Sequence, residues 1–173
     1  MSTLKVGTIQ DHANSTTALT IDNAGRILTP ARPAFRARIA NSSGGFGATG
    51  DLVFETEDFD IGNNYNVSNG RFTAPIDGIY HLMFRALSAT TTAGSANVGG
   101  DTVFGDLKKN GSVVAGARFY EYQQTGNWHH TFYLNTTIQL NATDYVQINV
   151  SSEFAYADQT AAYDPCFEGY LIG

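Results

Sequence analysis

Charged side chains are scarce in this sequence. They account for 15% of the 173 residues, whereas an average soluble domain has roughly a quarter. The formal net charge is -6, and a protein that binds nucleic acid needs a basic stripe to neutralise phosphates. We therefore expect no nucleic-acid partner. We interpret the one local group of basic residues as solvated strand residues rather than a contact for an acidic partner: Arg26, Arg32, Arg36 and Arg38.

Cysteine and long apolar runs are also scarce. Cys166 is the only cysteine, which excludes an intrachain disulfide and indicates a structural thiol. The first residues, MSTLKVGTIQ, lack the apolar core of a signal peptide, and no apolar run approaches the ~18 residues that span a membrane. We expect a protein that is made in a reducing cytoplasm and does not insert into membranes.

Signatures of catalysis are absent as well. There is no GxSxG, no HExxH and no glycine-rich phosphate loop between a strand and a helix. His129 and His130 are adjacent, so on a strand they point to opposite faces and do not chelate one ion. We predict no enzyme, no catalytic residue and no cofactor. A metal stays unknown: calcium needs about six to eight oxygen ligands, and the carboxylates that offer them are Glu55, Glu57, Asp58, Asp60, Asp101, Asp106, Asp158 and Asp164.

Strand-forming residues are abundant. Nine Tyr and eleven Phe accompany many β-branched residues. Residues 34–39 alternate between apolar and basic side chains, as in a strand with one buried face. Residues 103–122 are centred on Asn110-Gly111, the strongest short hairpin signal. About ten short strands and no convincing helix predict an all-β sandwich or jelly roll. The other strand-like runs are 51–60, 70–75, 78–87, 131–150 (split at 141–144) and 167–173.

Residues 1–29 differ from the rest. They contain three short strand-like runs separated by turn residues: 4–9, 18–22 and 25–29. Their apolar side chains are too few for one copy to build a core, whereas three copies around a common axis have enough. Pro30 and Pro33 then stop regular pairing. We therefore divide the chain into an N-terminal segment for attachment and trimerisation, residues 1–32, and one domain, residues 33–173.

The stretch FDIGNNYNVSNGRFTAPIDGIYHLMF (59–84) resembles the signature of the complement C1q and tumour-necrosis-factor-like superfamily. Three other stretches resemble further family strands, in the right order: 33–39, 138–150 and 167–172. Thr143 departs from the pattern by replacing the usual Gly before the aspartate, and Leu82 stands where an aromatic is common. We predict the matching positions to be the fold-motif core: Phe35, Phe59, Tyr65, Gly70, Phe72, Pro75, Gly78, Tyr80, Leu140, Asp144, Phe167 and Gly169.

The resemblance implies a jelly-roll domain that works as a homotrimer, because the family packs three jelly rolls side by side with aromatic and aliphatic faces at the axis. It places Phe167, Tyr170 and Ile172 in the core or near that axis. Residues 1–32 lack the Gly at every third position that a collagen stalk needs. They instead resemble short N-terminal segments of phage virion proteins, through LKVGTIQ, ALTID and GRI.

These resemblances imply a non-enzymatic structural protein of a bacteriophage virion. We expect a homotrimeric fibre or fibre tip that attaches to the host surface, with a surface glycan as the candidate ligand, while residues 1–32 bind other virion proteins. Loops carry contacts on a rigid scaffold, and the loops concerned are 41–50, 88–101 and 151–164.

Three loop aromatics are candidates for stacking on a sugar, although core or trimer contacts are equally open for them: Phe154, Tyr156 and Tyr163. Two alternative functions remain. One is a capsid decoration or cement protein that docks through its N-terminal segment, and the other is a cell-encoded glycan-binding lectin module.

Overall fold

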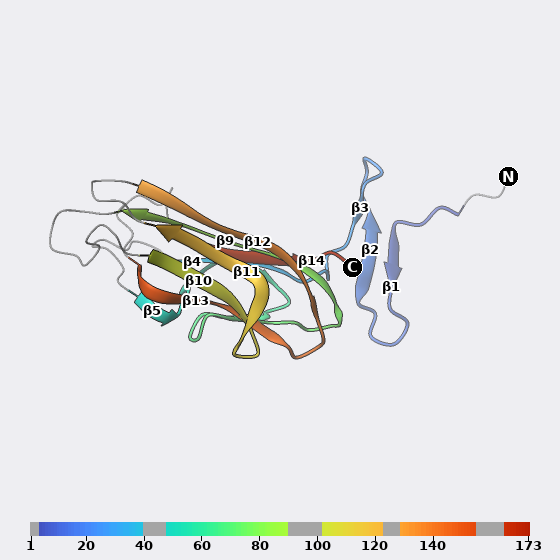
Figure 1. Cartoon of the computed structure of the whole chain (residues 1–173). Helices are drawn as coiled ribbons and strands as arrows, with labels where there is room; N and C mark the ends of the chain where they lie inside the picture. The colour runs from blue at the N-terminus through green and yellow to red at the C-terminus, as the bar shows by residue number, and fades with distance from the viewer. Residues whose placement is uncertain (1–3, 40–47, 90–101, 123–128, 155–164) are drawn as a thin grey trace.

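The computed structural model describes residues 4–39, 48–89, 102–122, 129–154 and 165–173. Across these ranges the chain is all-β, as predicted from the sequence, with fourteen strands in three sheets (Figure 1). No described residue belongs to a helix that is long and apolar enough to cross a membrane.

A five-stranded sheet, in the order β12-β9-β14-β4-β6, forms one layer of a sandwich. All neighbouring strands in it pair antiparallel. The last strand of the described chain, β14, lies in the middle, so that Phe167 pairs with Ala37 on one side and with Phe84 on the other. The strands are β4 (Ala34–Arg38), β6 (Thr56–Ile61), β9 (Gly78–Ala89), β12 (His129–Leu140) and β14 (Cys166–Leu171).

A six-stranded sheet forms the other layer, in the order β11-β10-β13-β8-β7, with β5 also paired to β13. Its long centre, β10 and β13, pairs Leu107 with Ile148, and both side chains are buried. The strands are β5 (Ala48–Asp51), β7 (Tyr65–Asn66), β8 (Arg71–Thr73), β10 (Thr102–Lys109), β11 (Ser112–Tyr122) and β13 (Tyr145–Phe154).

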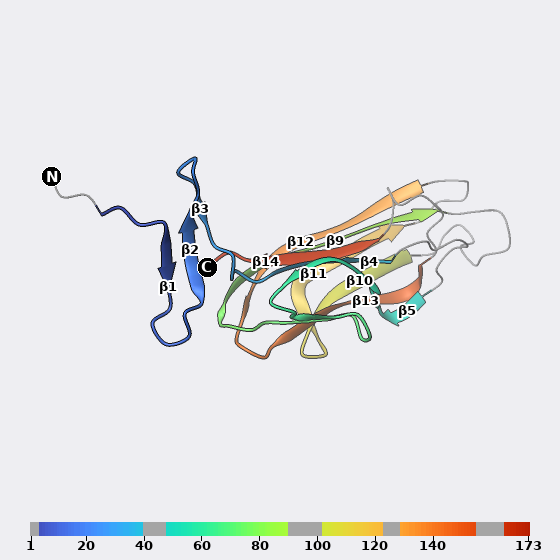
Figure 2. The same cartoon turned by 180° about the vertical axis from the view of Figure 1, so that it is seen from behind.

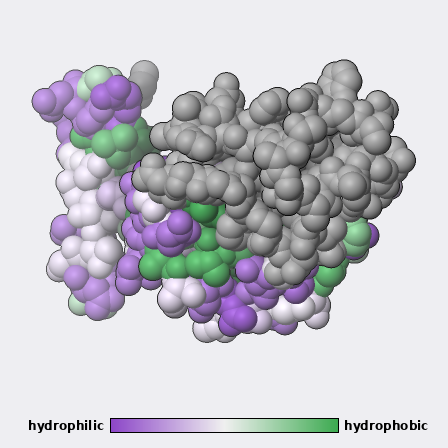
Figure 3. Space-filling model, turned by 90° about the vertical axis from the view of Figure 1, so that its left-hand side faces the viewer, coloured by the Kyte–Doolittle hydropathy of each residue, from purple (hydrophilic) through white to green (hydrophobic). Residues whose placement is uncertain are grey.

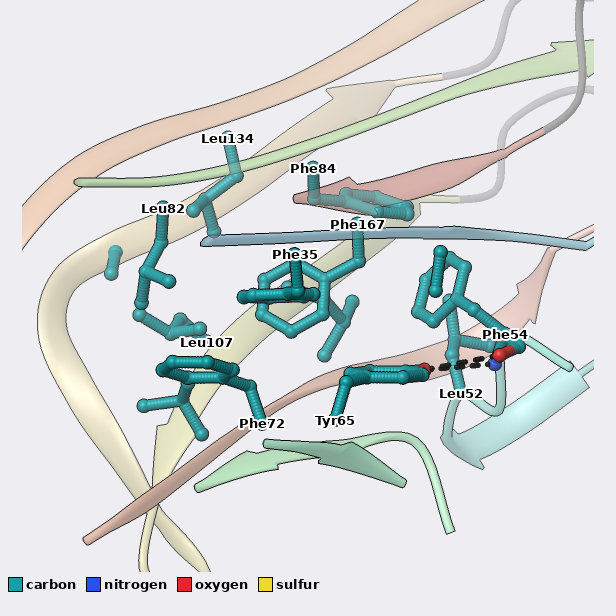
Figure 4. Packing of buried hydrophobic residues seen from close by; sticks show 14 of the residues in the cluster. Phe35, Leu52, Phe54, Tyr65, Phe72, Leu82, Phe84, Leu107, Leu134 and Phe167 are labelled. Carbon is teal, nitrogen blue, oxygen red and sulfur yellow. Dashed lines mark hydrogen bonds between the residues drawn. The ribbon is translucent and has the colours of Figure 1, made fainter. Parts of the chain in front are cut away.

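The core between the two sheets is rich in aromatic rings (Figure 4). Phe35 stacks on Phe72 with 4.4 Å between ring centroids, and it meets Phe167 edge-on at 5.0 Å. The Tyr65 hydroxyl donates a hydrogen bond to the Phe54 carbonyl oxygen and accepts one from the Phe54 N–H, both at 3.3 Å. A buried phenol is thus satisfied by backbone, as buried polar groups require.

Residues 51–60, expected to be one strand, belong to two strands in different sheets. β5 ends at Asp51 and pairs with β13, whereas β6 starts at Thr56 and pairs with β4. The chain crosses between the layers over residues 52–55, where Leu52 and Phe54 are buried. The prediction of a single strand was wrong because a run of apolar and polar residues does not reveal which sheet each part joins.

Two neighbouring turns connect long strands: one joins the β10–β11 hairpin, and the other takes the chain from β12 in one sheet to β13 in the other. Asn110 and Gly111 both have positive φ, 51° and 80°, as predicted for a two-residue hairpin turn. In the β12–β13 turn Thr143 has a φ of 73°, which is unusual for a β-branched residue. The carboxylate of Asp144 accepts hydrogen bonds from the Asn110 side chain (2.6 Å) and from the Asn141 backbone (2.8 Å), so the two turns are linked.

The N-terminal strands form a separate three-stranded antiparallel sheet, β1-β2-β3. Within the described ranges no strand of this sheet pairs with a strand of the sandwich, and Figures 1 and 2 show it standing beyond the end of β14. Its strands are β1 (Thr8–Gln10), β2 (Thr17–Ile21) and β3 (Ile27–Leu28). Its exposed apolar side chains, with those just before β1, are Leu4, Val6, Ile9, Ile21, Ile27 and Leu28.

The fold-motif positions divide by burial. Gly78 and Asp144 are half-buried. Phe59 and Pro75 are exposed, so their expected place in the core was wrong. Phe59 lies on edge strand β6, where a bulge pairs it with Arg36 on the outward side of the sheet; Pro75 lies in the turn after β8. The buried positions are Phe35, Tyr65, Gly70, Phe72, Tyr80, Leu140, Phe167 and Gly169.

Candidate interaction surfaces

The described part of the chain contains no group of three or more His, Cys, Asp or Glu side chains that could hold a metal ion. Two of the carboxylates considered for calcium are already paired with arginine: Asp58 with Arg36 and Arg38, and Asp106 with Arg118. Three others, Asp101, Asp158 and Asp164, lie outside the described residues. His129 and His130 belong to β12, but their side chains also lie outside the description.

The arginines that cluster in the sequence are balanced by nearby acids. Arg38 Nε lies 2.8 Å from Asp58 Oδ1, and Arg36 Nε lies 3.1 Å from Asp58 Oδ2 and 3.5 Å from Glu168 Oε2. In the N-terminal sheet, Arg26 Nε lies 2.6 Å from Asp22 Oδ2. These half-exposed or exposed pairs contribute little to stability individually, but each of these three arginines has an acidic partner.

The thiol of Cys166 is buried on the outward side of β14, beneath arginine side chains. Arg85 Nε donates a hydrogen bond to Cys166 Sγ at 3.1 Å. Burial raises the pKa of the Cys166 thiol, and the hydrogen bond from Arg85 only partly offsets this effect. A nucleophilic cysteine needs an accessible thiolate with a lowered pKa, so this environment does not suit a nucleophile.

The outward face of the six-stranded sheet is a polar network. Arg118 donates two hydrogen bonds to the Asp106 carboxylate, from Nε at 2.7 Å and from Nη2 at 2.9 Å. Asp51 accepts from Lys108 (2.9 Å) and Asn149 (2.7 Å). Burial acts to raise the pKa of Asp51, but the hydrogen bonds from Lys108, Asn149 and Gln147, with the positive charge of Lys108, together outweigh it and the pKa is lowered. Polar groups that satisfy one another in this way suit a face that stays in water.

The outward face of the five-stranded sheet is different. Neighbouring strands place apolar side chains side by side: Ile172 beside Ile79, and Tyr170 across Ala34 from Ile61. Figure 3 views the molecule from the left-hand end of Figure 1 and shows hydrophobic surface (green) between hydrophilic residues (purple). We call these exposed residues the apolar strip: Phe59 (48% exposed), Ile61 (40%), Ile79 (40%), Tyr170 (48%) and Ile172 (44%).

His81 lies at the border of the apolar strip. Its ring centroid is 5.1 Å from that of Tyr170, and its Nε2 is 2.7 Å from Asn135 Oδ1. Contacts with Asn135 on β12 and Tyr170 on β14 hold the imidazole between the two neighbouring strands. This edge of the apolar strip therefore ends at a polar pair.

Sequence reasoning placed Tyr170 and Ile172 in the core or near a threefold axis, and the structure exposes both on the strip. It missed Ile79 altogether. The core-facing alternate set of β9 is apolar and includes Tyr80, Leu82 and Phe84, whereas the outward set mixes Ile79 and Met83 with His81 and Arg85. This mixed pattern gave no clear signal that Ile79 belongs to an apolar surface.

A polar groove of about 620 Å³ lies where the two sheets part, between the edge strands β6 and β7 and the β12–β13 turn. This groove could not be predicted from the sequence, because its lining comes from segments far apart in the chain. It is lined by Glu57, Asn63, Asn64, Tyr65, Asn66, Val67, Thr73, Ala74, Pro75 and Thr143.

The loop residues predicted to face a ligand are not placed by the structure. Tyr156 and Tyr163 lie outside the described residues, and Phe154 ends β13 with a side chain that is likewise outside the description. Their role as sugar-stacking aromatics stays a prediction.

Comparisons with known proteins agree on the sandwich. The family model for the C1q domain matches residues 34–172. The globular domain of zebrafish complement 1qA superimposes with a TM-score of 0.59 at 18% identity, covering 82% of this chain and 98% of that one. Murine APRIL superimposes with a TM-score of 0.60 at 9% identity, covering 82% of this chain and 99% of that one. At such low identities the two structures establish the fold alone.

Proposed function

Because the chain belongs to the C1q domain family, we propose that it is a non-enzymatic structural protein that works as a homotrimer on the surface of a bacteriophage virion. Domains of this type are generally non-enzymatic and usually form trimers. The proposed trimer contacts the host surface, with a surface glycan as its ligand. Other virion proteins hold it through residues 1–32.

The observation that supports a trimer is the contrast between the two outward faces. One carries paired polar groups, and the other carries the apolar strip. Complete burial of a large apolar side chain contributes about 1.5–3 kcal/mol, so covering the remaining half of each strip residue contributes on the order of 1 kcal/mol. In a closed ring every subunit buries the same surfaces, so this stabilising free energy is contributed once by each subunit.

The N-terminal sheet supports attachment to a larger particle. Its apolar side chains are exposed, and it lies at one end of the sandwich (Figure 1). The end of β9, the start of β10 and the end of β13, which adjoin the predicted contact loops, lie at the opposite end. In the proposed arrangement the first end docks on the particle and the opposite end contacts the host. The resemblance of LKVGTIQ, ALTID and GRI to phage virion segments points the same way.

A capsid decoration protein is the second candidate. The observation that favours it is the small size of the N-terminal sheet, whose three strands have only three, five and two residues. Such a sheet is long enough to dock on a shell but adds little length to a fibre. In this alternative the sandwich faces outwards from the capsid, and contact with the host is not required.

Analytical ultracentrifugation of the full chain tests the trimer: we expect three times 18.6 kDa, and a stable folded monomer at micromolar concentration would refute it. Immunogold micrographs of phage particles test the location. Label on the tail supports the fibre or tip, label on the head supports decoration, and unlabelled particles would favour a cell-encoded lectin.

Removing residues 1–29 separates the two roles of the chain. We expect a β-rich trimer that no longer joins particles, because the sandwich keeps its own core and the apolar strip. Exchanging the 88–101 loop should have the opposite effect, with normal assembly and altered host attachment. Incorporation of the shortened protein at the normal copy number would show that the N-terminal segment is not the anchor.

A further inference from the structure

We propose that the polar groove between β6, β7 and the β12–β13 turn binds a neutral saccharide. Its volume of about 620 Å³ is within the range of small-molecule sites. Four polar side chains reach it from four segments: Glu57 from β6, Asn63 from the β6–β7 turn, Thr73 from the end of β8, and Thr143 from the β12–β13 turn. The groove is separate from the apolar strip, so this inference and the proposed trimer can fail independently.

The hydrogen-bonding groups of these four side chains are available to a ligand. Within the described part of the chain, no side-chain hydrogen bond or ion pair engages any of them. Their backbones, in contrast, are fixed: the Thr73 N–H donates to the Asn64 carbonyl oxygen and the Thr143 N–H donates to the Ala74 carbonyl oxygen, both at 2.8 Å. A ligand therefore displaces no protein–protein hydrogen bond from these four side chains, although ordering them on binding has an entropic cost.

The chemistry of the lining selects the ligand class. The Glu57 carboxylate accepts hydrogen bonds, the Asn63 amide both donates and accepts them, and the hydroxyls of the two threonines can donate or accept. Sugar hydroxyls are likewise both donors and acceptors, so they match this lining. Val67 and Pro75 add apolar surface on which the C–H face of a sugar ring can rest. The lining contains no cationic side chain, and Glu57 is negative. Sulfated, phosphorylated and acidic sugars are therefore disfavoured, and a neutral saccharide is favoured.

Two residues of the lining have left-handed backbone, and of these Thr143 is the strained one because Asn tolerates positive φ. Asn63 has a φ of 56° and Thr143 a φ of 73°, and they are two of the four non-glycine residues with positive φ in the described chain. Glycine adopts this conformation without cost, whereas a β-branched residue is an outlier there. Strained residues of this kind cluster at functional sites. Thr143 thus lowers stability while it places a hydroxyl at the groove.

This strain allows stability and binding to be tested separately. In Thr143→Gly and Asn63→Gly, the substitution relieves the strain and removes the polar side chain from the groove. Ser15→Gly is the matched control, since Ser15 also has a positive φ (54°) but lies in the N-terminal β1–β2 turn. Glu57→Gln tests the carboxylate without changing its shape.

The assay is saturation-transfer NMR on the full chain with neutral oligosaccharides of mannose, galactose and N-acetylglucosamine, and with sialyllactose and a heparin disaccharide as charged probes. We expect at least one neutral probe to bind. Thr143→Gly and Asn63→Gly should each weaken that binding roughly two- to tenfold, the scale of one lost neutral hydrogen bond, and Glu57→Gln should weaken it about tenfold, the scale of one lost hydrogen bond to a charged group. Both glycine variants should melt at the same temperature as the parent or higher, and Ser15→Gly should leave binding unchanged.

Three results would overturn the inference. One is the absence of binding by every neutral probe at millimolar concentration. Another is preferential binding of the charged probes. The third is neutral-sugar binding that survives the three groove substitutions, which would move the site to another part of the molecule. A lower melting temperature for Thr143→Gly would show instead that this side chain serves the fold.

Discussion

Replacing Phe72 by Ala tests the aromatic core at its centre. The Phe72 side chain is fully buried and lies between Phe35, at 4.4 Å between ring centroids, and Tyr80, at 5.7 Å. A buried Phe→Ala change costs about 3–5 kcal/mol. The rings of Phe35 and Tyr80 come from β4 and β9 of the opposite sheet, whose pairing keeps them from closing the cavity, so we expect the upper part of that range. For a domain of this size 1 kcal/mol corresponds to about 2–4 °C, which predicts a melting temperature lower by about 8–20 °C.

Thermal melts followed by circular dichroism, at one fixed protein concentration, provide the measurement. Tyr120→Ala is the control, because this aromatic lies on the outward face of the six-stranded sheet and is 63% exposed; its melting temperature should change by no more than about 2 °C, as for other surface substitutions. If Phe72→Ala melted like the parent, the register that pairs Phe72 with Tyr65 and Val146 would be incorrect.

Three further outcomes are expected. Gly70→Ala should destabilise the protein more than Gly116→Ala in urea denaturation. Both glycines have positive φ, but a Cβ at Gly70 would collide with the Leu52 carbonyl oxygen, whereas nothing lies within 4 Å of a Cβ at Gly116. Equal losses of stability in the two variants would contradict the collision. Hydrogen bonds from Lys109, Asn141 and Asn110 lower the pKa of Asp144 from 3.8 to about 2, so its stabilising effect is complete above about pH 4 and is lost as the pH falls towards 2. Asp144→Asn should remove that part of the acid dependence of unfolding; an unchanged pH profile would argue against it. Tyr170→Glu should shift the sedimenting mass towards 18.6 kDa, whereas Val113→Glu on the polar face should not, and an intact Tyr170→Glu trimer would place the interface elsewhere.

Alternation along single strands was enough to predict much of the sandwich. In β4 the apolar residues Phe35 and Ala37 are buried, and Arg36 and Arg38, which alternate with them, are half-buried, as the period of two requires. Asn110-Gly111 predicted its turn because both residues tolerate positive φ. These features depend on local geometry, which a short stretch of sequence contains.

Features that depend on distant partners were predicted less well. The exposure of Phe59 follows from a bulge opposite Arg36, and a bulge is a property of two paired strands. The conformation of Thr143 could not be read from its residue type, which disfavours it. The polar groove was missed for a similar reason, because Glu57 and Thr143 are brought together only when the two sheets pack.

The place of β14 has a consequence for how the protein is made. This strand is the last of the described chain to be synthesised, yet it is the central strand of the five-stranded sheet, between β9 and β4. Until Cys166–Leu171 has emerged from the ribosome, β4 and β9 have no partner between them and the core lacks Phe167. Pairing of such distant segments is slow. We expect the sandwich to close only after β14 has been translated, so that the apolar strip, which includes Tyr170 and Ile172, is complete only once the sandwich can enter the proposed trimer.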